Sequence, residues 1–166
     1  TCSSAGNAAT LGLPRELGGA GGDVLSYAMA VVGLAKVCGT TAVILSAHTS
    51  LCCAPIFENG TEEQKMKYLP DLCSGKKIGA FGLTEPGSGS DSAAMQTMAV
   101  KSGNGWVLNG TKRYITNSPF AKVALIMART SKEALPKNAH VSAFIVPMDT
   151  PGITVGKSDK KMGQAG

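Results

Sequence analysis

Residues 81–91 read Phe-Gly-Leu-Thr-Glu-Pro-Gly-Ser-Gly-Ser-Asp, a stretch whose apolar start and turn-rich end organise the rest of the chain. With the apolar residues just before it, the start predicts a brief buried strand. Pro86, Gly87 and Gly89 then break regular structure, and the glycines let the backbone approach a ligand closely. Free N–H groups over residues 87–90, with neighbouring hydroxyls, would form a concavity for an anion such as a phosphate. The alternative is a surface turn with a polar rim.

The composition of the 166-residue chain is that of a folded globular protein, with 43% hydrophobic and 16% charged residues. The formal net charge of +5 is unevenly placed, because residues 1–60 carry −1 and residues 61–166 carry +6. The basic residues of the second part form scattered pairs without interleaved aromatic residues. This pattern does not indicate nucleic-acid binding.

The cysteines indicate a reducing compartment. There are five, without a Cys-x-x-Cys pair, and no histidine joins them in a metal-site pattern. We interpret them as reduced and mostly buried, as in a cytosolic protein. The N-terminus lacks the basic start and apolar core of a secretory signal, and the apolar stretch 40–54 is too short and interrupted to span a bilayer. A soluble protein with neither a membrane nor a nucleic acid as partner is expected.

The first half of the chain has helical spacing of its apolar residues. Residues 1–10 show no periodicity and are left unassigned. Helices are predicted over residues 24–37, after the N-cap Asp23, and over residues 40–51. The second helix is apolar nearly all round and should be buried. His48 within it is interpreted as a hydrogen-bonded core histidine and not as a catalyst, because no carboxylate partner is evident nearby.

A third helix is predicted to begin at Thr61-Glu62-Glu63-Gln64, which has the Thr-x-x-Gln pattern of a capping box. Met66, Leu69 and Leu72 follow at three-residue spacing. Pro70 should bend this helix or end its first part.

The periodicity changes from helical to strand-like after Lys77, so we place a domain boundary near residues 74–77. Asn104-Gly105 is a strong hairpin signal between the segments 96–101 and 106–109. This second half is predicted to form an antiparallel sheet or barrel. Its further short strands are expected at residues 111–116, 123–129, 141–146 and 153–155.

The ordered set of motifs resembles the acyl-CoA dehydrogenases, and the short-chain or butyryl-CoA members most closely. The match runs from about Leu11 to the end of the chain and rests on many segments. They include Gly60–Lys65, Tyr68–Pro70, Phe81–Asp91, Leu108–Lys112, Tyr114–Asn117 and Asp149–Gly152.

The resemblance implies an α+β fold in which part of an N-terminal helical domain precedes an incomplete antiparallel β-barrel-like domain. Residues 1–10 would be an unassigned lead, residues 11–76 the helical domain and residues 77–166 the middle β domain. The C-terminal helical domain of the family would be absent from this chain.

In that family the Thr-Glu-Pro-Gly-x-Gly-Ser loop binds FAD, so the resemblance implies an FAD site here. Leu83 and Thr84 would meet the pyrimidine edge of the flavin, where an N–H and a hydroxyl favour negative charge on the reduced ring. Tyr114 would pack along the isoalloxazine, and Thr116 would hydrogen-bond its N5 atom. The alternative for Tyr114 and Ile115 is a role as sheet-core residues. The implied cofactor-binding residues are Phe81, Gly82, Leu83, Thr84, Glu85, Pro86, Gly87, Ser88, Gly89, Ser90, Tyr114, Ile115 and Thr116.

The implied activity is α,β-dehydrogenation of a short-chain fatty acyl-CoA to the trans-2-enoyl-CoA. Ser90 and, in a loop, Asn138 are the candidates for contact with the acyl-CoA substrate. The family's base is a glutamate in the C-terminal domain, so this chain alone is expected to be inactive. Glu85 belongs to the cofactor loop and is not that base.

The resemblance also implies partners and a location. An electron-transferring flavoprotein would reoxidise the flavin, and the full-length protein would be a homotetramer. The location would be the cytoplasm in a bacterium, which we prefer, or the mitochondrial matrix in a eukaryote.

The main alternative is a nucleotide-binding module without oxidoreductase activity, based on Gly87-x-Gly89 or Gly19-x-Gly21. Neither completes G-x-G-x-x-G, and no Lys-Ser/Thr follows the loop at residues 18–22, which we interpret as structural. A protein-interaction domain would bind a partner and no cofactor. An acyl-CoA oxidase would differ in letting oxygen reach the flavin.

Overall fold

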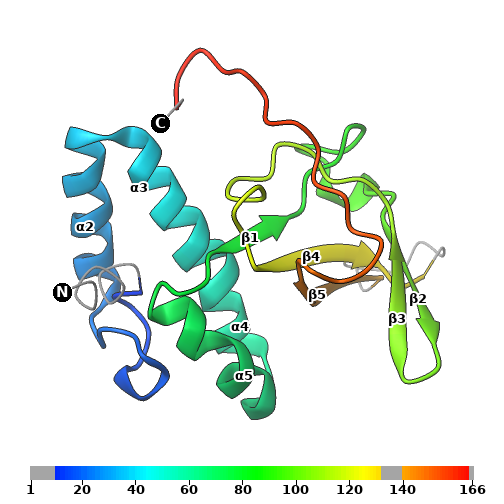
Figure 1. Cartoon of the computed structure of the whole chain (residues 1–166), viewed down its shortest axis with the longest axis horizontal. Coiled ribbons are helices and arrows are strands. Elements are labelled where there is room, and N and C mark those ends of the chain that lie inside the picture. The colour runs from blue at the N-terminus through cyan, green and yellow to red at the C-terminus, as the bar shows by residue number, and fades with distance from the viewer. Residues whose placement is uncertain (1–9, 132–139, 165–166) are drawn as a thin grey trace.

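The computed structural model describes residues 10–131 and 140–164. It contains a helical region followed by a β-sheet, which confirms the expected fold class (Figure 1). Helices α2 to α5 lie on one side of the molecule and strands β1 to β5 on the other. The connection from the helices to the sheet runs from the end of α5 at Cys73 to the start of β1 at Gly79.

The first described segment is a compact loop. A short 3₁₀ turn at Arg15–Leu17 is followed by glycines whose N–H groups are already used within the loop. Gly19 donates to Pro14, and Gly21 donates to Leu13. This agrees with a structural role for residues 18–22 and leaves no row of free donors for a phosphate.

Helix α2 (Val24–Val37) begins where expected. The carboxylate of its N-cap Asp23 accepts the backbone N–H of Ser26 at 2.8 Å and its hydroxyl at 2.6 Å. These bonds satisfy one of the donors that a helix start leaves free.

The second helix is longer than expected, because α3 (Gly39–Ser46), a π-helical segment (Ala47–Cys53) and α4 (Ala54–Asn59) are continuous. Gly39–Asn59 has 21 residues, and an 18-residue stretch within it has a mean hydropathy of 1.4, so by length and composition the helix could cross a membrane. The helix therefore extends beyond the apolar stretch 40–54 that the sequence indicated. Cys52, Cys53 and Ile56 are buried in the protein core, and this packing stabilises the helix beyond Leu51. Their burial favours a core helix over a membrane span.

Helix α5 (Glu62–Cys73) has the predicted capping box. The N–H of Gln64 donates to the Thr61 hydroxyl at 3.2 Å, and the N–H of Thr61 donates to the Gln64 side chain at 2.9 Å. The helix does not end at Pro70, contrary to one of the two expectations for this residue. Leu69 and Leu72 are fully buried on either side of the proline, and this packing outweighs the lost hydrogen bond.

His48 is a core histidine, as expected, and it connects the helices to the sheet. Its Nδ1 atom accepts the N–H of Gly79 in β1 at 2.9 Å, and its Nε2 atom lies 3.2 Å from the carbonyl of Leu72 in α5. Since Nδ1 accepts, Nε2 carries the proton and donates to Leu72. Burial lowers the pKa of His48, so the ring is held neutral.

The sheet is mixed and open, and it differs in this respect from the antiparallel expectation. Its order is β1 (Gly79–Gly82), β4 (Val123–Arg129), β2 (Met98–Ser102) and β3 (Gly105–Asn109), with β5 (Val141–Pro147) on β4. The β1–β4 and β2–β4 pairs are parallel, whereas β2–β3 and β4–β5 are antiparallel. The parallel pairs arise because each strand reaches β4 through a long connection instead of a hairpin.

The hairpin between β2 and β3 confirms the Asn-Gly signal, with Gly103 and Asn104 in its loop. Gly103 has a φ of 57°, which glycine adopts without steric cost. Residues 111–116 and 153–155 form no strand, contrary to expectation. Most residues of both segments are exposed, and neither segment pairs with a strand in the described part of the chain.

The main core joins the two regions. Ile56 and Leu69 of the helices pack in one cluster with Val123 and Leu125 of β4, and Phe81 lies against it. A second cluster, around Ala80 and Ala124, is contacted by Ile115 and Ile126. The described cysteines are free thiols, as expected: Cys38, Cys52, Cys53 and Cys73.

Candidate functional site

The loop after β1 is a tight turn with an open tip. Glu85 and Ser88 exchange backbone hydrogen bonds of 2.9 and 3.2 Å, so Pro86 and Gly87 form the turn between them. The Ser88 hydroxyl donates to the carbonyl of Asp91 at 2.7 Å. The backbone N–H and the hydroxyl of Ser88 therefore both donate within the loop, and the expectation of a free N–H at this residue was wrong.

The two loop glycines face open space. A Cβ atom built on Gly87 or Gly89 would meet no atom within 4 Å, and neither residue has a positive φ. Within the part of the chain that the structure describes, the N–H groups of Gly87, Gly89 and Ser90 make no hydrogen bond. Nothing in the described part of the chain therefore requires glycine at these positions, whereas a ligand against the backbone would. The arrangement suits an anionic group such as a pyrophosphate.

Glu85 points inward, away from the open tip. Its carboxylate accepts the N–H of Gln96 at 2.6 Å, the N–H of Thr97 at 3.0 Å and the Thr97 hydroxyl. The ammonium of Lys112 lies 2.8 Å from Glu85 Oε1 and forms an ion pair with it. The side chain of Glu85 is only 5% exposed and that of Lys112 only 10%. Burial alone would raise the pKa of Glu85, but these hydrogen bonds outweigh it and lower the pKa to about 2.

Two contacts tie this loop to the segment 112–116. The ammonium of Lys112 also donates to the carbonyl of Leu83 at 3.0 Å. The N–H of Arg113 donates to the carbonyl of Thr84 at 2.8 Å. The two stretches that the sequence singled out, although almost 30 residues apart, are thus held side by side.

The second stretch is an exposed, constrained turn instead of a strand. Tyr114 is 73% exposed and has a φ of 58°, a left-handed conformation that is rare for a bulky residue. The guanidinium of Arg113 lies 4.9 Å from the centre of its ring. Thr116 is exposed, whereas Ile115 packs against the small core cluster around Ala80. Tyr114 is therefore not a sheet-core residue, but Ile115 is partly one.

Asn117 fixes the far end of this turn. It has a φ of 70°, and its side-chain amide donates to the carbonyl of Ile44 at 3.1 Å and to that of Gly79 at 3.2 Å. The turn is therefore anchored to helix α3 on one side and to β1 on the other.

The remaining predicted residues have different surroundings. Phe81 and Gly82 belong to β1, and a Cβ on Gly82 would come within 2.6 Å of Ile126. Gly82 therefore packs closely against the end of the Ile126 side chain. Leu83 and Thr84 are half-buried, and Ser90 is exposed beside the glycines. Asn138 lies outside the described residues.

Sequence reasoning missed the residues that hold the site together, above all Lys112, Thr97 and Asn117. Lys112 and Asn117 stood inside segments that carried the family resemblance but received no role. The sequence signal available for Lys112 and Asn117 was their place in the segments that carry the family resemblance, whereas no local pattern pairs Thr97 with Glu85. Among the described residues, no cluster of His, Cys, Asp or Glu suits a metal ion.

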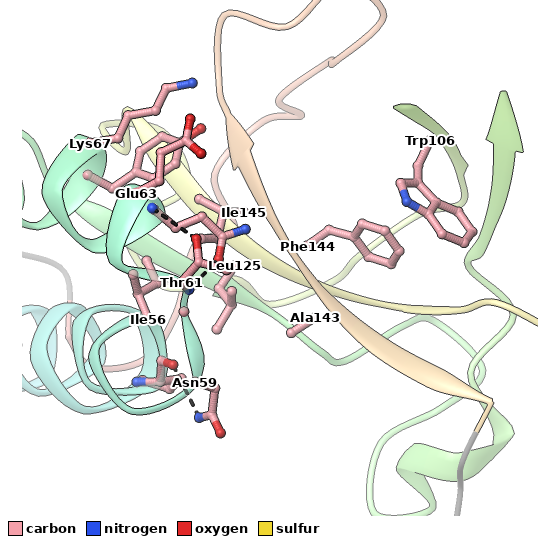
Figure 2. A pocket seen from close by; sticks show the side chains of 14 residues that line it. Ile56, Asn59, Thr61, Glu63, Lys67, Trp106, Leu125, Ala143, Phe144 and Ile145 are labelled. Atoms are coloured by element: carbon pink, nitrogen blue, oxygen red, sulfur yellow. Dashed lines mark hydrogen bonds between the residues drawn. The ribbon is translucent and has the colours of Figure 1, made fainter. Parts of the chain in front are cut away.

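A separate groove of about 650 Å³ lies between the helices and β5. Figure 2 shows Ile56, Asn59 and Lys67 on its helical side and Phe144 facing Trp106 beyond the strand. The two aromatic rings meet edge to face with centroids 5.5 Å apart. The residues that line the groove include none of the loop 81–91 or of the segment 114–116, so it is distinct from the candidate cofactor site.

Two family profiles match the chain. The profile of the acyl-CoA dehydrogenase N-terminal domain matches residues 5–76, and that of the middle domain matches residues 80–166. The short-chain specific acyl-CoA dehydrogenase of Clostridium acetobutylicum is 54% identical over 155 residues, which are 92% of this chain and 40% of that protein. The human mitochondrial short-chain enzyme is 47% identical over 154 residues, 93% of this chain and 37% of its own length. The chain thus spans about 40% of the length of these relatives.

Solved structures of acyl-CoA dehydrogenases are similar to the fold of this chain. Butyryl-CoA dehydrogenase from Megasphaera elsdenii matches with a TM-score of 0.89 and 43% identity, over 98% of this chain and 44% of that one. A glutaryl-CoA dehydrogenase from Mycobacterium smegmatis, solved with FADH2, matches with a TM-score of 0.88 and 36% identity, over 98% of this chain and 41% of that one.

Proposed function

The chain belongs to the acyl-CoA dehydrogenase family, and we propose on this premise that the protein containing it oxidises short-chain acyl-CoA thioesters with FAD as cofactor. The product would be the trans-2-enoyl-CoA. The short-chain preference is supported by the Clostridium and human relatives and by the Megasphaera butyryl-CoA enzyme. Residues 11–76 and 77–166 would be the N-terminal helical and middle β domains of that protein.

The observation that carries the proposal is the open backbone at Gly87 and Gly89, held beside the exposed segment Tyr114–Thr116. The free N–H groups of the loop would bind the pyrophosphate of FAD, and the residues from Phe81 to Ser90 would form this wall of the site. Tyr114 would offer its ring face to the isoalloxazine, with Ile115 supporting it from the core. Thr116 would donate its hydroxyl hydrogen bond to the flavin N5 atom.

FAD, when bound, accepts a hydride from the β carbon of the substrate while a base takes the α proton. This chain would bind and orient the reactants. Ser90 and Asn138 are the proposed contacts for the acyl-CoA. Glu85 is unsuited to be the base, because its carboxylate is buried, ion-paired and directed away from the open tip. The base would come from a glutamate in a C-terminal helical domain of the longer protein.

The partners and location follow from the same proposal. An electron-transferring flavoprotein would reoxidise the flavin, and the longer protein would form a homotetramer. Its location would be the bacterial cytoplasm, or the mitochondrial matrix if the source is eukaryotic.

The test uses the longer protein that contains this chain. We expect the purified protein to carry the visible absorption spectrum of bound FAD, and butyryl-CoA added without oxygen to bleach it. Comparison of butyryl-, octanoyl- and palmitoyl-CoA measures the chain-length preference. A bound nucleotide without flavin absorption would favour the nucleotide-binding alternative. A flavin that no acyl-CoA reduces would overturn the proposed activity.

The electron acceptor is tested separately. We expect turnover with an artificial acceptor or an electron-transferring flavoprotein, and little with oxygen alone. Rapid turnover with oxygen would favour an acyl-CoA oxidase.

A further inference from the structure

One side chain bridges the two halves of the candidate flavin site directly. The ammonium of Lys112 lies 2.8 Å from Glu85 Oε1 and 3.0 Å from the carbonyl oxygen of Leu83. Its side chain is only 10% exposed. An ammonium so far removed from water needs these acceptors, so its position is defined by them.

The partner of Lys112 is itself fixed by other contacts. Glu85 also accepts the N–H groups of Gln96 and Thr97, which lie in the connection to β2 and cannot swing as free side chains do. The carboxylate is therefore immobile, and Lys112 extends this rigidity to Leu83 and to its own segment. The stem of Lys112 lies against Gly82, where a built Cβ would come within 3.3 Å of Lys112 Cγ.

The segment that follows Lys112 depends on such anchors. Tyr114 is 73% exposed and has a φ of 58°, so its own packing does not hold it in place. Strained backbone persists only where the surroundings fix it. Here Lys112 and the N–H of Arg113 hold the near end, and Asn117 holds the far end.

We propose that Lys112 is a positioning residue of the flavin site. It sets the separation between the Leu83–Thr84 edge and the Tyr114–Thr116 turn, so that both contact the ring at once. This inference rests on the proposed FAD site. It adds that a buried ion pair, whose carboxylate is directed away from the open loop tip, controls the geometry of the groups that would contact the ring.

The experiment uses the longer protein with FAD bound. Lys112→Met removes the ammonium and keeps the stem, but it leaves the Glu85 carboxylate buried without a counter-ion. A second variant, Glu85→Gln/Lys112→Met, removes both charges and should fold even if the first does not. Lys101→Met changes an exposed lysine on β2 and is the matched control.

Four quantities are measured in each variant: hydrogen exchange in the peptide 111–117, the FAD dissociation constant, the rate of flavin reduction by acyl-CoA, and the substrate KM. Without Lys112, we expect the Arg113 amide, which donates to Thr84, to exchange at least about tenfold faster. We expect reduction to slow about 10- to 100-fold, since small displacements of reacting groups have effects of this size. The substrate KM should stay within about twofold, since Lys112 is buried and its ammonium is bonded to Glu85 and Leu83.

A lower melting temperature with unchanged exchange, FAD affinity and reduction rate would show that Lys112 is only structural and would overturn the inference. If no acyl-CoA reduces the flavin of the wild-type protein, the proposed function fails. The role of Lys112 is then still decided by amide hydrogen exchange at residues 111–117 and by the affinity for FAD. If the wild type binds no FAD, the flavin site itself is refuted and the inference falls with it.

Discussion

Tyr114 and Asn117 combine left-handed backbone with a place at the candidate site. Such a conformation costs a non-glycine residue about 1–3 kcal/mol and is found where the surrounding structure imposes it. The hydrogen bonds of Lys112, Arg113 and Asn117 impose it here. Strain of this kind beside the open loop tip supports a binding role for the turn, because packing alone would not select it.

Thr116→Val should slow flavin reduction more than it harms folding. The side chain is exposed, so the substitution leaves no buried polar partner behind. Loss of one preorganised donor typically costs about 10²- to 10³-fold in rate. Stopped-flow measurement of flavin reduction checks this, with Thr111→Val as the control at a nearby exposed threonine. Equal reduction rates in wild type and Thr116→Val would remove Thr116 from the site.

Gly87→Ala and Gly89→Ala should weaken FAD binding without destabilising the protein. Each Cβ would enter open space in this chain, and neither residue needs a positive φ. We expect the FAD dissociation constant to rise at least about tenfold, equivalent to about 1.4 kcal/mol. The melting temperature of the FAD-free protein should be unchanged or slightly higher. Gly12→Ala, at another open position, is the control. FAD affinity equal to that of the control would count against the loop as the binding site.

At the level of structural elements, the Glu85 carboxylate joins the loop 83–91 to Gln96 and Thr97, which lead into strand β2. Its pKa is lowered from an ordinary value of 4.5 to about 2, so its ionised form stabilises the folded state. This contribution is complete above about pH 5 and is lost as the pH falls toward 2. A shift of this size corresponds to roughly 3 kcal/mol.

Acid titration of the unfolding free energy tests this contribution. Denaturant unfolding at several pH values should show a steeper loss of stability below pH 5 in the wild type than in Glu85→Gln. Glu62→Gln, at a largely exposed carboxylate, should behave as the wild type does. Identical pH profiles for wild type and Glu85→Gln would refute the role of the buried carboxylate.

His48 joins the long helix Gly39–Asn59 to α5 and β1. We expect its protonation to give the stability of the fold a second pH dependence. Its pKa is lowered by burial, and protonation of Nδ1 would oppose the N–H of Gly79 that it now accepts. The stabilising effect is therefore complete above the unfolded-state pKa of about 6.5 and declines as the pH falls below it.

The measurement is again the unfolding free energy, now between pH 7.5 and 5. His48→Gln replaces the ring by an uncharged amide. It should lower the unfolding free energy at pH 7.5 and reduce the dependence of that free energy on pH. His140→Gln, at another buried histidine, leaves the His48 contacts intact and is the control variant. An unchanged pH dependence in His48→Gln would contradict the prediction.

At the scale of the whole molecule, the described chain exposes an apolar face on α2. No residue of this helix is buried, and Val24, Leu25, Met29 and Val37 are 81, 66, 66 and 89% exposed. The sheet is also open, with β3 and β5 each paired on one side. Exposed apolar surface and unpaired strand edges both favour association.

We therefore expect the isolated 166-residue chain to associate and to show no acyl-CoA dehydrogenation, even with FAD and butyryl-CoA added. No carboxylate of the proposed site is available as a base, and the α proton needs one. Light scattering checks the association of the chain, and an assay with an artificial electron acceptor checks the absence of dehydrogenation. The longer protein, assayed in parallel, should turn over. Butyryl-CoA oxidation by the isolated chain would contradict the view that the base lies elsewhere.

The sequence by itself determined the local features of this protein. Asp23 and the Thr61/Gln64 box define helix starts, and Asn104 with its glycine neighbours defines the hairpin, because each acts within four residues along the chain. The order of helices followed by strands and the segments that form the candidate site could also be predicted.

Only the tertiary structure decided how those segments meet. The continuation of the helix past Leu51, the parallel pairing of β1 with β4 and the left-handed turn at Tyr114 depend on partners far away in the chain. Glu85 shows the reason most directly. The motif places a carboxylate at this position, but its direction follows from hydrogen bonds to residues 11 to 27 positions away, and no local pattern specifies them.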